Sequence, residues 1–207
     1  MTPVTVLEGD LTPELARDLR AARRVAVDTE TSGLDWVTDE LQLCQLFTPA
    51  TGAVLLRNVT DRPSQLADLL ADANVVKVFH FAPFDLRFLQ GRWGASVRSV
   101  ECTKAASKIL FPDLASEQHS LRGLLHRLLD IEISKGSVRT SDWGTPQLSA
   151  EQMRYAATDV EHLLVLAELL GQRLVEAGVR PLFEKVCAYM PVDAQLEVSG
   201  IPNPLTY

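Results

Sequence analysis

The residues that could do chemistry begin with two acidic side chains close together. Asp28 and Glu30 are separated by one residue in a β-prone run that starts at Val25. The two-residue period of a strand places both carboxylates on the same face. Because burying two like charges together is unfavourable unless a cation compensates, we expect the pair to bind a divalent metal ion if it lies near a cleft. By itself, such a pair is more often a solvated strand end.

A third acid, Asp85, follows the apolar run 75–79 and lies where a helix would begin. Ligands of open α/β sheets commonly bind at such strand exits. The alternative is an acid in the first turn of a helix, which the helix dipole favours.

A tyrosine and a fourth acid, Tyr155 and Asp159, are four residues apart in a long run with helical character. This spacing places the phenol and the carboxylate on one face of a helix, one turn apart. Apolar residues around them indicate that the face is partly buried, where an unpaired Asp159 would be costly and a metal-bound one reasonable. Taken alone, such a tyrosine is more often an aromatic residue at the edge of the core.

The elements that must position these residues begin with strands and end with helices. The pattern predicts strands at 25–29, 41–47, 53–56, 75–79 and 97–102, and helices at 11–24, 64–72, 84–91, 103–110, 120–129 and 149–177. Ser149 and Gln152 form a predicted capping box. We expect a single α/β domain over residues 1–207, with a helical second half and an extended proline-containing tail at 190–207.

Composition limits the function classes. The 207 residues carry a net charge of −7, which argues against a protein that follows long nucleic-acid backbones, although bound divalent cations would reverse the potential locally. The start of the chain lacks the pattern of a signal peptide and no run is typical of a membrane span, so we expect a cytoplasmic protein without a membrane partner. The three cysteines have no CxxC spacing and are interpreted as buried small residues.

Taken together, the acids and the tyrosine form an ordered series. The series runs from Asp28-x-Glu30 to Asp85 after a strand, and then to Tyr155 four residues before Asp159. It resembles the DEDD exonuclease superfamily in its tyrosine subclass, and specifically the ribonuclease D family. The likeness runs from about residue 4 to residue 198 and includes the segments 102–108, 133–135 and 141–143. It implies a ribonuclease H-like α/β fold, with a mixed five-stranded sheet flanked by helices and a helical C-terminal half, and 3′-5′ exonuclease activity.

Within that family, the chain is similar to the compact nano-RNase C group. The likeness lies in the absence of accessory helical domains, in His80-Phe81 before Asp85, in Thr103-Lys104, and in the segment 190–200. It implies a homo-oligomeric ring such as an octamer, and a substrate of very short RNA with a free 3′ end, above all dinucleotides.

The resemblance also implies a mechanism. Two divalent cations, Mg²⁺ or Mn²⁺, would be held roughly 3.5–4 Å apart by the four acids Asp28, Glu30, Asp85 and Asp159. One ion would prepare water for attack and the other would stabilise the leaving 3′ oxygen. Tyr155 would orient the water, because its ordinary pKa of about 10 disfavours full proton abstraction at neutral pH. His162, three residues after Asp159, is the competing candidate for that role.

Further residues are candidates for substrate binding. His80 lies at the strand exit near the scissile region or ribose, and Phe81 could stack on a base there. Leu34 could wedge between two bases, and phosphate or base contacts are assigned to Lys104, Lys108, Lys135 and Trp143. Packing or solvation is the alternative for each of them.

Three other function classes compete with a short-RNA exonuclease. A 3′-5′ DNA exonuclease, or a broader ribonuclease D-like enzyme of RNA processing, would use the same acids. A non-catalytic nucleic-acid-binding relative is expected to have lost at least one acid, whereas all four and the tyrosine are present here. A structural scaffold would explain the helices but not the ordered acids.

Overall fold

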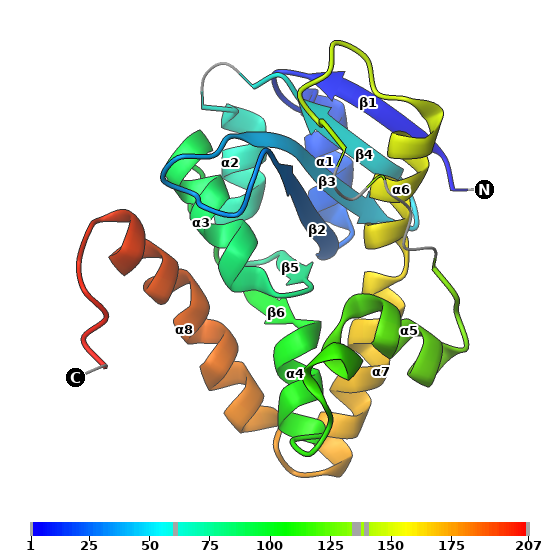
Figure 1. The fold of residues 1–207 in the computed structure, drawn as a ribbon, viewed down its shortest axis with the longest axis vertical. Helices are drawn as coiled ribbons and strands as arrows, with labels where there is room; N and C mark the ends of the chain where they lie inside the picture. The colour runs from blue at the N-terminus through cyan, green and yellow to red at the C-terminus, as the bar shows by residue number, and fades with distance from the viewer. Residues whose placement is uncertain (1, 60–61, 134–137, 139–140, 206–207) are drawn as a thin grey trace.

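The computed structural model describes residues 2–59, 62–133, 138 and 141–205 (Figure 1). No helix among these residues is both long and apolar enough to cross a membrane. The elements are β1 (Val4–Glu8), α1 (Pro13–Ala21), β2 (Arg24–Thr31), β3 (Leu41–Thr48), β4 (Gly52–Arg57), α2 (Ser64–Ala71), β5 (Val76–Phe79), α3 (Ala82–Trp93), β6 (Val100–Cys102), α4 (Thr103–Leu110), the 3-10 helix η1 (Ser116–His119), α5 (Leu121–Leu129), α6 (Ala150–Glu161), α7 (Leu163–Glu176) and α8 (Arg180–Val198).

The strands form one mixed sheet in the order β1-β4-β3-β2-β5-β6. Strands β2, β3 and β4 are antiparallel neighbours, whereas β5 runs parallel to β2, β6 to β5, and β1 to β4. The predicted mixed sheet, flanking helices and helical C-terminal half are confirmed, but the count of five strands is wrong. The sixth strand, β1, was missed because it is a short edge strand whose side chains are mostly exposed, so it lacks a buried face.

Alternate residues of β2 face different helical layers. Val25 and Val27 pack in the core that includes α1, α2 and α3, whereas Ala26 packs with Ala157 and Leu163 of α6 and α7. This alternation follows from the two-residue period of a strand. Asp28 and Glu30 follow Ala26 by two and four residues on β2, so their side chains lie on the same face as that of Ala26, which is the α6 side of the sheet.

The predicted helix 149–177 is two helices. The capping box is confirmed, since Ser149 Oγ accepts from the Gln152 amide at 3.1 Å and Gln152 Oε1 accepts from the Ser149 amide at 2.9 Å. The helix ends at Glu161, and His162 separates α6 from α7. Both segments are helix-prone, so the sequence pattern does not mark the bend. The bend lets α6 pack on β3 and β4 while α7 packs on α4.

The predicted extended tail from residue 190 is also wrong. Helix α8 continues to Val198 and contains Pro191 within it. A proline inside a helix removes one intrahelical hydrogen bond, and here packing compensates: Cys187, Met190 and Ala194 of α8 are buried. Helix α8 lies along α3 and the edge strand β6 (Figure 1).

Candidate active site

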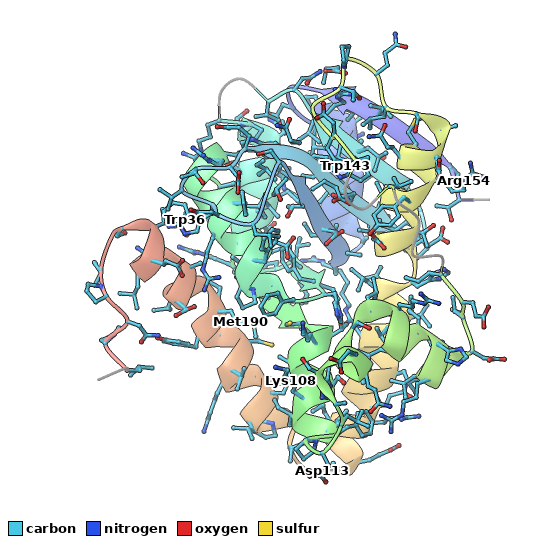
Figure 2. All side chains as sticks on the ribbon, in the orientation of Figure 1. Trp36, Lys108, Asp113, Trp143, Arg154 and Met190 are labelled. Atoms are coloured by element: carbon cyan, nitrogen blue, oxygen red, sulfur yellow. The ribbon has the colours of Figure 1, made fainter. Side chains whose placement is uncertain are left out.

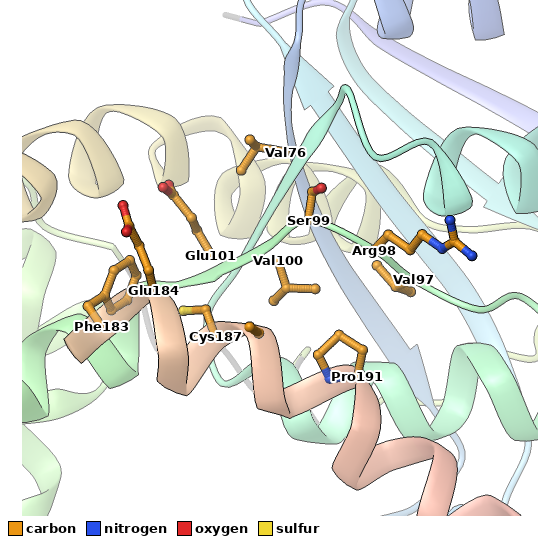
Figure 3. Close-up of a pocket in the computed structure, with 11 residues that line it drawn as sticks. Val76, Val97, Arg98, Ser99, Val100, Glu101, Phe183, Glu184, Cys187 and Pro191 are labelled. Carbon is orange, nitrogen blue, oxygen red and sulfur yellow. The ribbon is translucent and has the colours of Figure 1, made fainter. Parts of the chain in front are cut away.

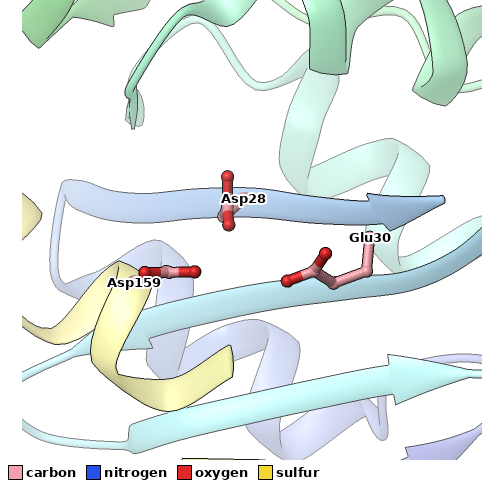
Figure 4. Close-up of side chains that lie close together, drawn as sticks. All are labelled: Asp28, Glu30 and Asp159. Carbon is pink, nitrogen blue, oxygen red and sulfur yellow. The ribbon is translucent and has the colours of Figure 1, made fainter. Parts of the chain in front are cut away.

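Three carboxylates converge on the α6 side of the sheet. Asp28 and Glu30 project from β2, and Asp159 projects from the last turns of α6 (Figure 4). One oxygen from each lies within 4.8 Å of the other two. Carboxylate oxygens at such mutual distances are the ligands preferred by Mg²⁺ and Mn²⁺. The donor set therefore fits a divalent cation.

The fourth acid, Asp85, approaches β2 from the α3 side and is outside this three-oxygen cluster. Strand β5 pairs with β2 only from Arg24 to Ala26 and ends at Phe79. Beyond that point, helix α3 brings Asp85 beside β2, where the Thr29 hydroxyl donates a hydrogen bond to Asp85 Oδ1 at 2.7 Å.

Burial raises the pKa of three of the four acids, Asp28, Asp85 and Asp159. The pKa of Asp28 is raised well above its ordinary value, first by burial and then by the charges of Asp85, Asp159 and Glu30. Burial raises the pKa of Asp85 and that of Asp159 to about 7. A divalent cation would remove this cost by supplying the missing positive charge.

Tyr155 lies one helical turn before Asp159 and hydrogen-bonds its carboxylate. Burial, followed by the charges of Asp159 and Glu30, raises the pKa of the phenol above its ordinary value. The hydroxyl therefore stays protonated at neutral pH, so it can donate a hydrogen bond but is poorly suited to act as a base. The ring of Trp143 packs against it, with centroids 6.0 Å apart and planes at 44°.

A cavity of about 560 Å³ opens beside Tyr155 and Asp159. Its wall includes Arg154 and His162, and the His162 ring Nε2 lies 3.1 Å from Glu161 Oε1. This cavity provides space for a substrate at the carboxylates. His162 lines the wall and pairs with Glu161, whereas Tyr155 contacts Asp159.

A 3′-5′ exonuclease family model matches residues 3–175, the part of the chain that carries all four acids and the tyrosine. The chain belongs to this 3′-5′ exonuclease family, in its ribonuclease D-like DEDD branch. Ribonuclease D of Granulibacter bethesdensis is 30% identical over 179 residues, which cover 86% of this chain and 44% of that protein. The chain spans less than half the length of the first curated relatives it matches.

Solved structures extend the likeness over the whole chain. The structure of Brucella melitensis NrnC with bound Mg²⁺ is 32% identical, with a TM-score of 0.88 and coverage of 100% of both chains. The structure of the same protein bound to pGG is 33% identical, with the same TM-score and coverage. The predicted ribonuclease H-like fold and the resemblance to the compact nano-RNase C group are therefore confirmed.

Two predicted substrate residues of this family member are exposed. Leu34 is 86% exposed on the loop that follows β2, and Phe81 is 46% exposed at the end of β5. Phe81 has a left-handed backbone with φ of 72°, a conformation that is strained for a bulky residue. Lys104 Nζ lies 4.4 Å from the centroid of the Phe81 ring. The contacts of these side chains with bases and phosphates stay predictions.

Two other predicted contacts are directed into the protein instead. His80 Nδ1 lies 2.9 Å from Thr103 Oγ1, its Nε2 is also buried, and burial lowers the pKa of the ring to about 3. Trp143 is only 2% exposed. His80 Nε2 and Trp143 Nε1 are both buried without a hydrogen-bond partner among the described residues. The Trp143 ring packs against Tyr155, and the substrate contacts of His80 and Trp143 stay predictions.

The remaining two candidates are Lys108 and Lys135. Lys108 is exposed on α4, and Figure 2 shows it well away from Trp143. Lys135 lies outside the described residues.

Sequence reasoning missed two residues that contact the acids. Gln45 of β3 stands opposite Asp28 in the ladder, is fully buried, and donates from Nε2 to Glu30 Oε1 at 3.3 Å. Thr29 holds Asp85. A glutamine inside the apolar run of β3 was a detectable signal, because a buried polar side chain requires a partner. The role of Thr29 required knowledge of where α3 begins.

A separate groove of about 450 Å³ lies between β6 and α8 (Figure 3). Its lining contains none of the predicted site residues. Glu101 in its wall binds Arg24 Nη2 at 2.6 Å and Arg180 Nη2 at 2.7 Å. Glu184 in the same wall pairs with Arg180 as well, and the groove is distinct from the cluster of acids.

Proposed function

We propose that this family member is a metal-dependent 3′-5′ exoribonuclease that hydrolyses short RNA, above all dinucleotides, to nucleoside 5′-monophosphates. The observation that carries the proposal is the convergence of Asp28, Glu30 and Asp159 within 4.8 Å, with Asp85 beside them. Acids that gather on a surface without a function are not expected to be as buried as these, nor to lie together within the residues that an exonuclease family model matches.

Two divalent cations, Mg²⁺ or Mn²⁺, would neutralise the acids and stabilise the charge that develops on the reacting phosphate. Asp28, Glu30 and Asp159 would hold one ion. Asp28 and Asp85 would hold the second. The Tyr155 hydroxyl would position the attacking water beside Asp159. Water oxygen bonds to phosphorus, the bond from phosphorus to the 3′ oxygen breaks, and that oxygen takes up a proton.

The preference for short RNA rests on three supports. A neighbour that covers the whole chain was solved bound to pGG. Leu34 and Phe81 are exposed apolar side chains that would contact bases. The net charge of −7 suits a substrate with few phosphates. By the same likeness we propose a homo-oligomer, to be measured by light scattering coupled to size-exclusion chromatography.

The test is a substrate panel in Mn²⁺: 5′-phosphorylated RNA of two to about twenty nucleotides beside matched DNA, with initial rates recorded against length. Asp28→Asn is the inactive control, and Asp113→Asn, at an exposed acid in the turn after α4, is the matched surface control. A steep preference for dinucleotides supports the proposal. Rates on RNA that do not fall with length would favour a broader ribonuclease D-like enzyme, and equal rates on DNA would favour a DNA exonuclease.

A further inference from the structure

We infer that helix α8 positions Leu34 through the hydrogen bond between Trp36 and Glu197. These two hydrogen-bonded side chains are called the latch below. Leu34 lies in the loop 32–40 between β2 and β3, directly after the metal-binding pair Asp28 and Glu30. The inference rests on the proposed function, because it concerns how Leu34 meets a short RNA. Glu197 lies beyond residues 3–175, the part that the family model matches.

The loop is held in one conformation by its own hydrogen bonds. The Ser32 amide donates to Glu40 O at 3.0 Å, and the Glu40 amide donates to Ser32 Oγ at 2.9 Å. Inside this closure, the Asp35 amide donates to Asp39 Oδ2 at 2.9 Å and the Asp39 amide to Asp35 O at 2.7 Å. Leu34 is thus exposed on a structured loop. An exposed apolar side chain on a rigid support is suited to binding, since little entropy is lost when a ligand meets it.

The same loop is fastened to two helices. Trp36 Nε1 donates to Glu197 Oε1 of α8 at 2.9 Å, and Figure 2 shows Trp36 between the loop and the C-terminal end of α8. The Trp36 ring lies on Gly91 of α3, where a Cβ atom would come within 2.7 Å of it. Arg92 of α3 adds hydrogen bonds from Nε to Asp39 O at 2.6 Å and from Nη2 to Val37 O at 3.1 Å. The loop therefore packs against α3 and is hydrogen-bonded to both α3 and α8.

Glu197 connects this loop to the helix that carries Asp85. One carboxylate oxygen accepts from Trp36, and the other pairs with Arg87 Nε, two residues after Asp85. Arg87 Nη2 also lies 3.4 Å from Asp193 Oδ2. An exposed ion pair contributes little to stability. The Glu197 carboxylate, however, joins α8 to both the loop 32–40 and α3. It therefore fixes the position of the loop relative to α3, and with it the position of Leu34 relative to the acids.

The test compares Trp36→Phe, which removes the indole N–H and also shortens the ring system that lies on Gly91, and Glu197→Ala with wild type. The matched control is Glu184→Ala, at the other end of α8, where the acid pairs with Arg180 and not with the loop. We expect KM for a 5′-phosphorylated dinucleotide to rise about five-fold in both latch variants, as for one lost hydrogen bond, with kcat within about two-fold of wild type. In a Leu34→Ala background the same substitutions should raise KM no further, because the latch acts through Leu34.

Three results would overturn the inference: an unchanged KM, a KM increase that adds fully to that of Leu34→Ala, or a loss of kcat at constant KM. Hydrogen exchange tests the latch without any substrate. Amides of 32–40 should exchange faster in both variants, while those of α6 keep the wild-type rate. If wild type cleaves no oligonucleotide, the proposed function fails. Unchanged exchange in the loop would refute the latch whatever the enzyme cleaves.

Discussion

Replacing Asp85 with asparagine is expected to stabilise the metal-free protein at pH 8. Asp85 is 2% exposed, and burial raises its pKa from 3.8 to about 7. Folding at pH 8 therefore places an ionised carboxylate among buried groups and near Asp28. The asparagine side chain is uncharged at every pH, and its amide oxygen can still accept the hydrogen bond from Thr29. The substitution thus removes the charge and keeps the contact.

The size and sign of the effect follow from the two pKa values. Below about pH 4 the carboxyl is protonated in both folded and unfolded chains, and it contributes no difference. Between about pH 4 and pH 7 the unfolded chain releases the proton while the folded protein keeps it, so stability falls as pH rises. Above pH 7 the full cost is present. A pKa displaced from 3.8 to about 7 corresponds to about 4 kcal/mol.

The assay is urea unfolding in EDTA at pH 5, 6, 7 and 8, for wild type, Asp85→Asn and the surface control Asp113→Asn. We expect the free energy of unfolding of Asp85→Asn to exceed that of wild type by about 2 to 4 kcal/mol at pH 8 and by less at pH 5. Adding Mn²⁺ should stabilise wild type more than the variant. An Asp85→Asn protein that is no more stable than wild type at pH 8 would refute the electrostatic reasoning, provided that Asp113→Asn shows no change.

Other predictions concern metal and turnover. Asp28→Asn or Asp159→Asn should reduce hydrolysis at least about 10³-fold while circular dichroism shows a folded protein, and full turnover in either would contradict the metal assignment. Tyr155→Phe should slow turnover about 10- to 100-fold without weakening Mn²⁺ binding by calorimetry, and an unchanged rate would remove its proposed role. Mn²⁺ affinity should rise between pH 6 and pH 8, because the pKa values of Asp85 and Asp159 lie near 7 and protons therefore compete with the metal ion. A Mn²⁺ affinity that does not change with pH would argue against these carboxylates as ligands.

The sequence predicted which of the candidate residues share a face because that geometry is local. Alternation along β2 determines that Asp28 and Glu30 share a face, and one helical turn separates Tyr155 from Asp159. Each relation depends only on the period of its own element. The order of the motifs then identified the family without any knowledge of how β2 and α6 pack.

Contacts between distant elements could not be predicted in this way. The burial of Trp143 against Tyr155, and the inward direction of His80, depend on the packing of loops and helices far apart in the sequence. Pro191 predicted an extended tail by local propensity, yet packing of α8 keeps the helix intact. Local rules therefore failed where tertiary contacts determined the outcome.

The two sides of β2 explain why Asp28 is the central acid. Glu30 and Asp159 lie with it on the α6 side, whereas Asp85 reaches β2 from the α3 side and is held by Thr29. The charges of all three raise the pKa of Asp28, so all three are electrostatically close to it. A substrate phosphate bound over Asp28 would therefore be flanked by carboxylates from both helices. Helix α3 carries Asp85 and is also joined through Arg87 and Glu197 to the loop of Leu34. The helix that carries the fourth acid is therefore also the helix to which the proposed base-contacting residue is tied.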